Sequence, residues 1–193
     1  PETLTYVTCS RVTVRVEDQQ GHTAIGWGET PLSVQWVWPS NLSYEERHAA
    51  LKAFCQSLVR AWAEFDAAGH PMETGHAFIE DALPKLLQQH NTERGGEPMP
   101  WLAALVCCSA FDIATHDAYG QLHGVPVYDT YNAEYMNRDL AAFLEPADKA
   151  GVSFANRWPA DFLVSPRPDT LPAWHLVGGK DWIAPEEDDG SVP

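Results

Sequence analysis

The sequence predicts an α+β domain in which a short antiparallel sheet comes first and a bundle of three helices follows. Within residues 7–17, Val12, Val14 and Val16 alternate with polar residues, the period of a half-buried strand. A turn-forming run at residues 18–21 leads into a second extended pattern at residues 22–30. After a loop at residues 31–42, apolar residues from residue 51 onward recur at steps of three and four. This order predicts helices gathered on one side of a small β-meander.

The end of the second predicted strand carries two glycines and an acidic residue. Gly26 and Gly28 weaken the strand locally, and such glycines usually mark a bulge or a close approach of another element. Glu29 follows them with no acid or base partner nearby in the sequence. We therefore interpret Glu29 as a structural residue.

Capping signals and apolar spacing predict the first two helices. Ser43 and Glu46 have the spacing of a capping box, in which each side chain bonds to the other residue's backbone N–H group. An apolar stripe over residues 51–65 predicts the helix that follows them. A second helix is predicted at about residues 74–90, with a kink at Pro84.

The third predicted helix, at residues 101–123, is nearly apolar in its first half and is the best candidate for the core. Gly124 and Pro126 end it, because glycine suits the position after a helix and proline cannot continue one. After this helix the patterns weaken, with a short helix expected at residues 138–144 and a strand at residues 173–177. We expect one domain at residues 1–131 and a loop-rich extension at residues 132–193.

Composition excludes several classes of partner. The 193 residues include 12 basic and 27 acidic side chains, for a net charge of −15, which repels nucleic acids and anionic membranes. No apolar run is long enough to span a bilayer and the first residues lack a signal-peptide pattern, so we expect a cytoplasmic protein without a membrane partner. The four cysteines form no C-x-x-C pair and are expected to be free thiols rather than zinc ligands.

Two stretches together resemble the mandelate racemase and muconate lactonizing branch of the enolase superfamily. Residues 26–31, Gly-Trp-Gly-Glu-Thr-Pro, are similar to the G-x-G-E that closes the capping sheet of that family. Residues 110–127 are similar to its helix pattern A-x-D-x-A-x-x-D-x-x-G-K-x-x-G-x-P, with glutamine in place of the usual lysine. The matching residues of the second stretch are Asp112, Asp117, Gly120, Gly124 and Pro126.

The resemblance implies a fold, an activity and a cofactor. Enzymes of this family hold Mg²⁺ with three carboxylates of a (β/α) barrel and remove an α-proton from a carboxylate substrate with a lysine or histidine. They include racemases, cycloisomerases and sugar-acid dehydratases. None of the lysines of this chain forms the K-x-K pair of such a barrel. We therefore expect a capping-domain fragment in which residues 132–193 are a linker and the start of a truncated barrel, reaching at most its first strand, with no catalytic residue, no metal ligand and no activity of its own. Its expected partner is that missing barrel.

Other interpretations stay open. Val34, Trp36 and Trp38 lie in a loop at residues 31–42 that the resemblance places at the barrel mouth, where they would face a substrate; they would equally well close over the domain's own core. Asp112 and His116, one helical turn apart, could bind a metal, but capping of neighbouring backbone or pairing with an arginine is the preferred interpretation.

The chain as a whole also has alternative interpretations. It could be a stand-alone interaction module that retains the capping fold, or a metal-binding or redox module built on its cysteines and histidines. Compared with the family that it resembles, the chain is expected to begin after the first strand of the capping sheet and the mobile loop that follows that strand. An unpaired strand edge and an uncovered apolar face predict self-association that increases as salt screens the charge.

Overall fold

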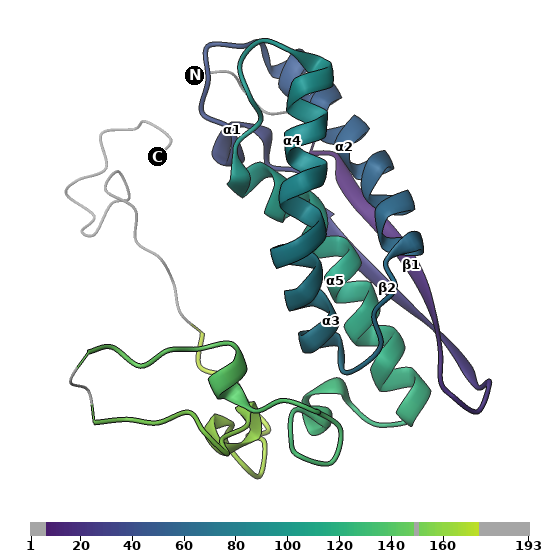
Figure 1. Cartoon of the computed structure of the whole chain (residues 1–193), viewed down its shortest axis with the longest axis vertical. Helices are drawn as coiled ribbons and strands as arrows, with labels where there is room; N and C mark the ends of the chain where they lie inside the picture. The colour runs from purple at the N-terminus through teal and green to yellow at the C-terminus, as the bar shows by residue number, and fades with distance from the viewer. Residues whose placement is uncertain (1–6, 149–150, 174–193) are drawn as a thin grey trace, which may run out of the picture. The chain divides into compact units, whose positions relative to one another are not determined.

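Two strands form an antiparallel hairpin, as the alternating pattern predicts. The computed structural model describes residues 7–148 and 151–173. Strand β1 (Cys9–Glu17) pairs with β2 (Thr23–Pro31), and Thr13 lies opposite Trp27 at the centre of the register. One face of the hairpin packs on helix α5 (Trp101–His123), which runs alongside both strands (Figure 1). The predicted α+β class is therefore correct.

Helix α2 (Tyr44–Glu64) begins at the predicted capping box. The Ser43 hydroxyl accepts the Glu46 N–H at 3.2 Å, and the Glu46 carboxylate accepts the Ser43 N–H at 3.1 Å. The predicted loop before it contains one additional turn of helix, α1 (Val34–Val37).

The second predicted helix is longer than expected and is interrupted by a turn of π-helix. It consists of α3 (Pro71–Ala77), a π-helical turn η1 (Phe78–Ala82) and α4 (Leu83–Arg94). The π turn comes immediately before Pro84, which has no N–H group for an α-helical hydrogen bond. A π-helical turn therefore lies just ahead of Pro84, where the sequence predicts a kink.

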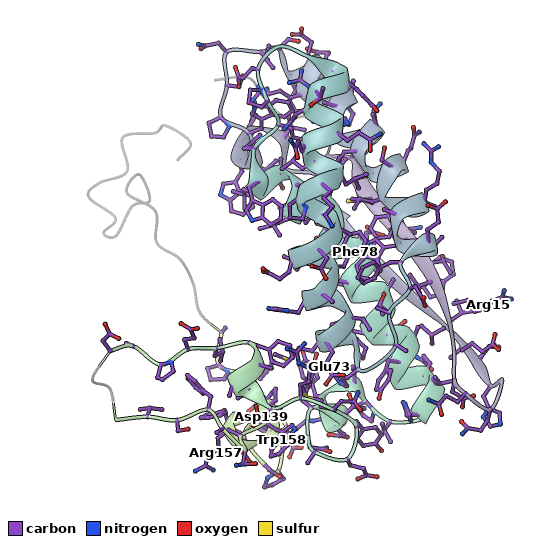
Figure 2. All side chains as sticks on the ribbon, in the orientation of Figure 1. Arg15, Glu73, Phe78, Asp139, Arg157 and Trp158 are labelled. Carbon is purple, nitrogen blue, oxygen red and sulfur yellow. The ribbon has the colours of Figure 1, made fainter. Side chains whose placement is uncertain are left out.

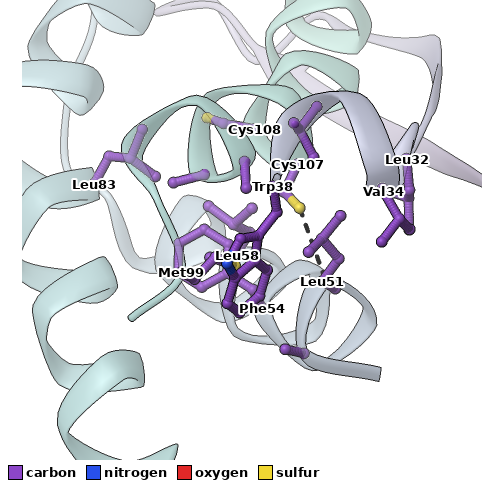
Figure 3. Close-up of a cluster of buried hydrophobic side chains, with 14 of the residues drawn as sticks. Leu32, Val34, Trp38, Leu51, Phe54, Leu58, Leu83, Met99, Cys107 and Cys108 are labelled. Carbon is purple, nitrogen blue, oxygen red and sulfur yellow. Dashed lines mark hydrogen bonds between the residues drawn. The ribbon is translucent and has the colours of Figure 1, made fainter. Parts of the chain in front are cut away.

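Helix α5 has the predicted bounds and supplies much of the core. Gly124 follows it in the left-handed conformation with φ of 66°, which only glycine adopts readily. Side chains of α2 and α5 meet in the cluster of Figure 3, where the Cys107 thiol bonds to the Leu51 carbonyl oxygen at 3.7 Å. All four cysteines are free thiols.

After α5 the described chain contains only short 3₁₀ turns, at Val127–Thr130, Leu140–Ala142 and Pro159–Phe162. The short helix predicted at residues 138–144 is one of these turns. The strand predicted at residues 173–177 lies almost wholly outside the described residues. Among the described residues, 7–148 and 151–162 group into one compact unit, and residues 163–173 fall outside it.

Candidate functional site

The two stretches that carry the family resemblance meet in the structure. Gly26 and Gly28 of β2 are buried directly against the backbone of α5. A Cβ at Gly26 would overlap the backbone of Ala114 and Ala118, and one at Gly28 would overlap the carbonyl oxygen of Ala110. These glycines therefore allow the close approach that the sequence predicts for them.

The acidic residues of the two stretches also have structural partners. Asp117 accepts the backbone N–H of Trp27 at 2.9 Å and so ties α5 to β2. Glu29 pairs with Arg11 on the neighbouring strand at 2.7 Å, and this hydrogen bond lowers the pKa of the exposed Glu29 carboxyl. The structural interpretation of Glu29 agrees with this cross-strand pair.

Gly120, Gly124 and Pro126, the last three residues of the second stretch that match the family pattern, lie where the chain reverses direction after α5. The Gly120 carbonyl accepts the Val125 N–H at 3.1 Å, and a Cβ at Gly120 would crowd that returning segment. Gly124 supplies the left-handed residue between them, and Pro126 then starts the first 3₁₀ turn. Each matched residue of this turn therefore has a role in the backbone path.

Asp112 and His116 do not form a metal site with the residues around them. The His116 Nδ1 lies 2.9 Å from the Asp112 carbonyl oxygen, closer than the 3.6 Å to the Asp112 carboxylate. Burial raises the pKa of the Asp112 carboxyl, and the nearby His116 opposes this shift. Within residues 7–148 and 151–173, no three histidine, cysteine or acidic side chains converge as metal ligands would. The Mg²⁺ that the resemblance implies therefore does not fit the described residues.

The proposed substrate-facing loop separates into buried and exposed residues. Val34 and Trp38 are 3% and 1% exposed and belong to the core, whereas Trp36 is 67% exposed. Trp38 is fixed at both ends, because its Nε1 donates to Glu97 at 3.0 Å and its carbonyl accepts from Arg47 at 2.6 Å. The expectation of a three-residue substrate surface is therefore corrected, and Trp36 alone of the three is accessible.

A buried carboxylate that the sequence analysis missed ties helix α3 to the segment after α5. The Glu73 carboxylate accepts four N–H groups: those of the backbone of His70, Asn137 and Arg138, and the Asn137 side-chain amide, at 2.7–3.1 Å (Figure 2). The sequence signal was a capping box of unusual composition, with His70 before Pro71 and Glu73 three residues on. We call Glu73 with these donors the Glu73 anchor.

His70 is fully buried, and its hydrogen bonds define its protonation. Its Nδ1 accepts the Met72 N–H at 3.1 Å, so this nitrogen carries no proton. The Thr130 hydroxyl donates to the Val127 carbonyl, so the His70 Nε2–H donates to Thr130. Burial, reinforced by His116, lowers the pKa of His70 to about 4. His70 is therefore a neutral structural histidine at pH 7.

A pocket of about 500 Å³ lies beside the second half of strand β1. Residues 14–20 of the hairpin form one side of it. Trp62 and Phe65, at the end of α2, form part of the other side. Residues of α5, among them Thr115, Tyr119 and Leu122, complete much of the lining, so the pocket lies between the hairpin and the helices.

The described helices include none that is both long and apolar enough to cross a membrane. Comparisons of the chain with protein-family models, with curated proteins and with solved structures returned no match.

Proposed function

We propose that this chain is the capping domain of a Mg²⁺-dependent enzyme of the enolase superfamily, without catalytic activity of its own. One observation carries the proposal. The two stretches that resemble the family are far apart in the sequence, yet they form one interface. Glycines of β2 lie against the backbone of alanines in α5, and the Asp117 carboxylate accepts the backbone N–H of Trp27, 90 positions away in the sequence. Two unrelated chance matches would not be expected to pack against each other.

In this proposal the barrel supplies the chemistry. The Mg²⁺ ligands and the base that removes the α-proton come from the barrel, because the described residues offer no convergent ligand set. The capping domain contributes shape to the substrate's surroundings. Trp36, on α1, is the residue that we assign to the barrel-facing surface, because it is the exposed member of its loop.

The coding region downstream of residue 193 tests the proposal directly. We expect it to encode a K-x-K pair followed by three acidic residues, each about one βα unit from the next. A stop codon after residue 193, with no reading frame downstream that encodes these residues, would contradict the proposal. An α-proton exchange assay in D₂O with Mg²⁺ is the biochemical counterpart, and the 193-residue chain alone is expected to exchange none from α-hydroxy acids or sugar acids.

Two tryptophans provide a matched pair for testing the assigned surface. In the protein joined to its barrel, Trp36→Ala is expected to lower kcat/KM about tenfold or more. Trp27→Ala removes a similarly exposed side chain, 59% exposed on the outer face of the hairpin, and is expected to leave kcat/KM unchanged. Equal effects of both substitutions would argue against a substrate-facing role for Trp36.

The second candidate function is a stand-alone interaction module. Ile25 and Trp27 favour it, because both are exposed on the outer face of the hairpin, where large apolar side chains have no packing role in the described fold. The same coding region separates the two candidates, since the module requires no barrel.

A further inference from the structure

Two cysteines from different helices meet where α2 packs on α5. The Cys107 thiol, on α5, lies 3.7 Å from the Leu51 carbonyl oxygen of α2 (Figure 3). In an α-helix the carbonyl of one residue accepts the N–H group of the residue four positions later, so the Leu51 oxygen also lies beside the backbone of Cys55. The Cys107 sulfur therefore lies on the turn of α2 that ends at Cys55.

The Cys55 side chain covers the same turn. Side chains of an α-helix lean toward its N-terminus, which for Cys55 is the direction of Leu51. The Cys55 and Cys107 thiols are hydrogen-bonded to each other, and the Ser10 hydroxyl, on β1, bonds to the Cys55 sulfur. Two sulfur atoms in such contact need only a small rotation of their side chains to reach bonding distance.

The two thiols differ in their surroundings. Cys107 is fully buried, whereas the described residues bury Cys55 only in part. The hydrogen bond with Cys107 lowers the pKa of the Cys55 thiol, and Ser10 adds to this effect while burial opposes it. The same hydrogen bond, together with burial, raises the pKa of Cys107. Because the thiolate is the reactive form of cysteine, Cys55 is the nucleophile of the pair.

The other two cysteines face elsewhere. Cys108, the next residue of α5, lies about 100° further round the helix, and its thiol lies against Trp62 (Figure 3). Cys9 is exposed and bonds to Glu29 on the outer face of the hairpin, opposite to the face from which Ser10 reaches Cys55. Cys107 is therefore the thiol placed to react with an oxidised Cys55.

We propose that Cys55 and Cys107 are a redox pair that hydrogen peroxide converts into a disulfide between α2 and α5. The Cys55 thiolate attacks one oxygen of the peroxide, so that the O–O bond breaks, a sulfenic acid forms and hydroxide leaves. The Cys107 sulfur then attacks the Cys55 sulfur, the S–O bond breaks, and the departing hydroxide takes the Cys107 proton as water. Two thiols and one peroxide thus give one disulfide and two waters.

The proposal does not depend on the barrel, because both sulfurs belong to helices of this chain. It predicts a protein whose thiols are free at rest and in which one specific pair closes under oxidation. Cys55 acts first and Cys107 second. The disulfide would fix the contact of α2 with α5 in the core, and a reductant such as dithiothreitol would reverse it.

Peptide mapping of the native chain after exposure to millimolar peroxide tests the proposal. Remaining thiols are blocked by alkylation and the protein is digested without reductant. We expect a linked pair of peptides that contains Cys55 and Cys107 and that disappears on treatment with dithiothreitol. Fragmentation between residues 107 and 108 assigns the link in the wild-type chain, so this result needs no variant.

The two adjacent cysteines of α5 provide a matched pair of variants. Cys107→Ala is expected to lower the yield of the link at least tenfold, and Cys108→Ala, an equally buried substitution, to leave it unchanged. Alanine avoids burying a hydroxyl group without a partner, and thermal melting checks that both variants fold. In Cys107→Ala, dimedone is expected to label Cys55 as a sulfenic acid at least tenfold more than in the wild-type protein, because the second thiol is missing.

Several results would overturn the proposal. One is a link from Cys55 to Cys108 or Cys9 in the folded protein. Another is oxidation of Cys55 to sulfenic or sulfinic acid with no link, or a Cys55 thiol that stays reduced in millimolar peroxide. Equal dimedone labelling of the wild-type protein and Cys107→Ala would likewise show that Cys107 does not react with the oxidised Cys55.

Discussion

The Asp117 carboxylate accepts the backbone N–H of Trp27 at 2.9 Å, across 90 positions of sequence. This bond joins the middle of β2 to the last third of α5, beside the point where Gly26 meets the α5 backbone. It therefore stabilises the interface on which the family proposal rests, and it also occupies one of the outward N–H groups of the β2 edge.

Asp117→Ala is expected to lower the free energy of unfolding by about 1–2 kcal/mol, because it leaves the Trp27 N–H without its acceptor. Asp117→Asn keeps an oxygen at that position and is expected to cost less than Ala. Urea denaturation measures both, and amide exchange at Trp27 is expected to be faster in the Ala variant. An unchanged Trp27 exchange rate would show that the bond does not protect this edge.

Gly28→Ala is expected to destabilise the protein by about 3 kcal/mol or more, because the new methyl group would overlap the carbonyl oxygen of Ala110 and the strand would have to move away from α5. Gly21 provides the control. It lies in the hairpin turn with φ of 84° and open space around it, a conformation that asparagine tolerates. Gly21→Asn is expected to cost under about 1 kcal/mol, and a cost equal to that of Gly28→Ala would contradict the close-packing argument.

Features that depend on neighbouring residues were predictable from the sequence. The Ser43–Glu46 capping box, the bounds of α5 and the Gly124 cap all follow from local spacing, and the structure confirms them. The close approach at Gly26 and Gly28 was one of two meanings of a strand glycine, and the structure selects it.

Features that depend on distant contacts were not predictable in the same way. Apolar residues in a loop have no period that distinguishes burial from exposure, so Trp36 and Trp38 were grouped although one is exposed and the other lies in the core. The donors that surround Glu73 include residues 137 and 138, and nothing in the local sequence pairs them with α3. The pocket beside β1 likewise exists only once the strand and α2 are side by side.

Glu73→Gln is expected to loosen the segment after α5. The glutamine amide group would face N–H donors that now bond to a carboxylate oxygen, so at least one hydrogen bond of the Glu73 anchor is lost and the free energy of unfolding falls by about 2 kcal/mol. Limited proteolysis is expected to cut faster near Asn137. Glu80→Gln, an exposed substitution in the neighbouring π turn, is the control and is expected to change neither quantity.

The neutral His70 predicts a specific loss of stability in acid. The native pKa is lowered to about 4 from an ordinary value of 6.5, so the unfolded chain binds a proton at a pH where the native protein does not. Its contribution to stability is therefore fully present above pH 6.5 and is lost as the pH falls from 6.5 to about 4. The expected loss is about 3 kcal/mol over that range. His116, Glu73 and His123 face the ring and contribute to its pKa, but burial is the largest cause.

His70→Asn isolates this effect from the titration of the acidic residues. Asparagine can still cap α3 by accepting the Met72 N–H, but it does not titrate. We expect the wild-type protein to be more stable than the variant at pH 7, and the difference in the free energy of unfolding to shrink by about 3 kcal/mol between pH 7 and pH 4. Leu58→Ala, which destabilises the core without removing a titratable group, is the control and is expected to keep a constant difference. If the His70→Asn difference is equally constant across that range, then His70 accepts a proton as readily in the folded protein as in the unfolded chain, and its neutral, Nε2-protonated assignment is wrong.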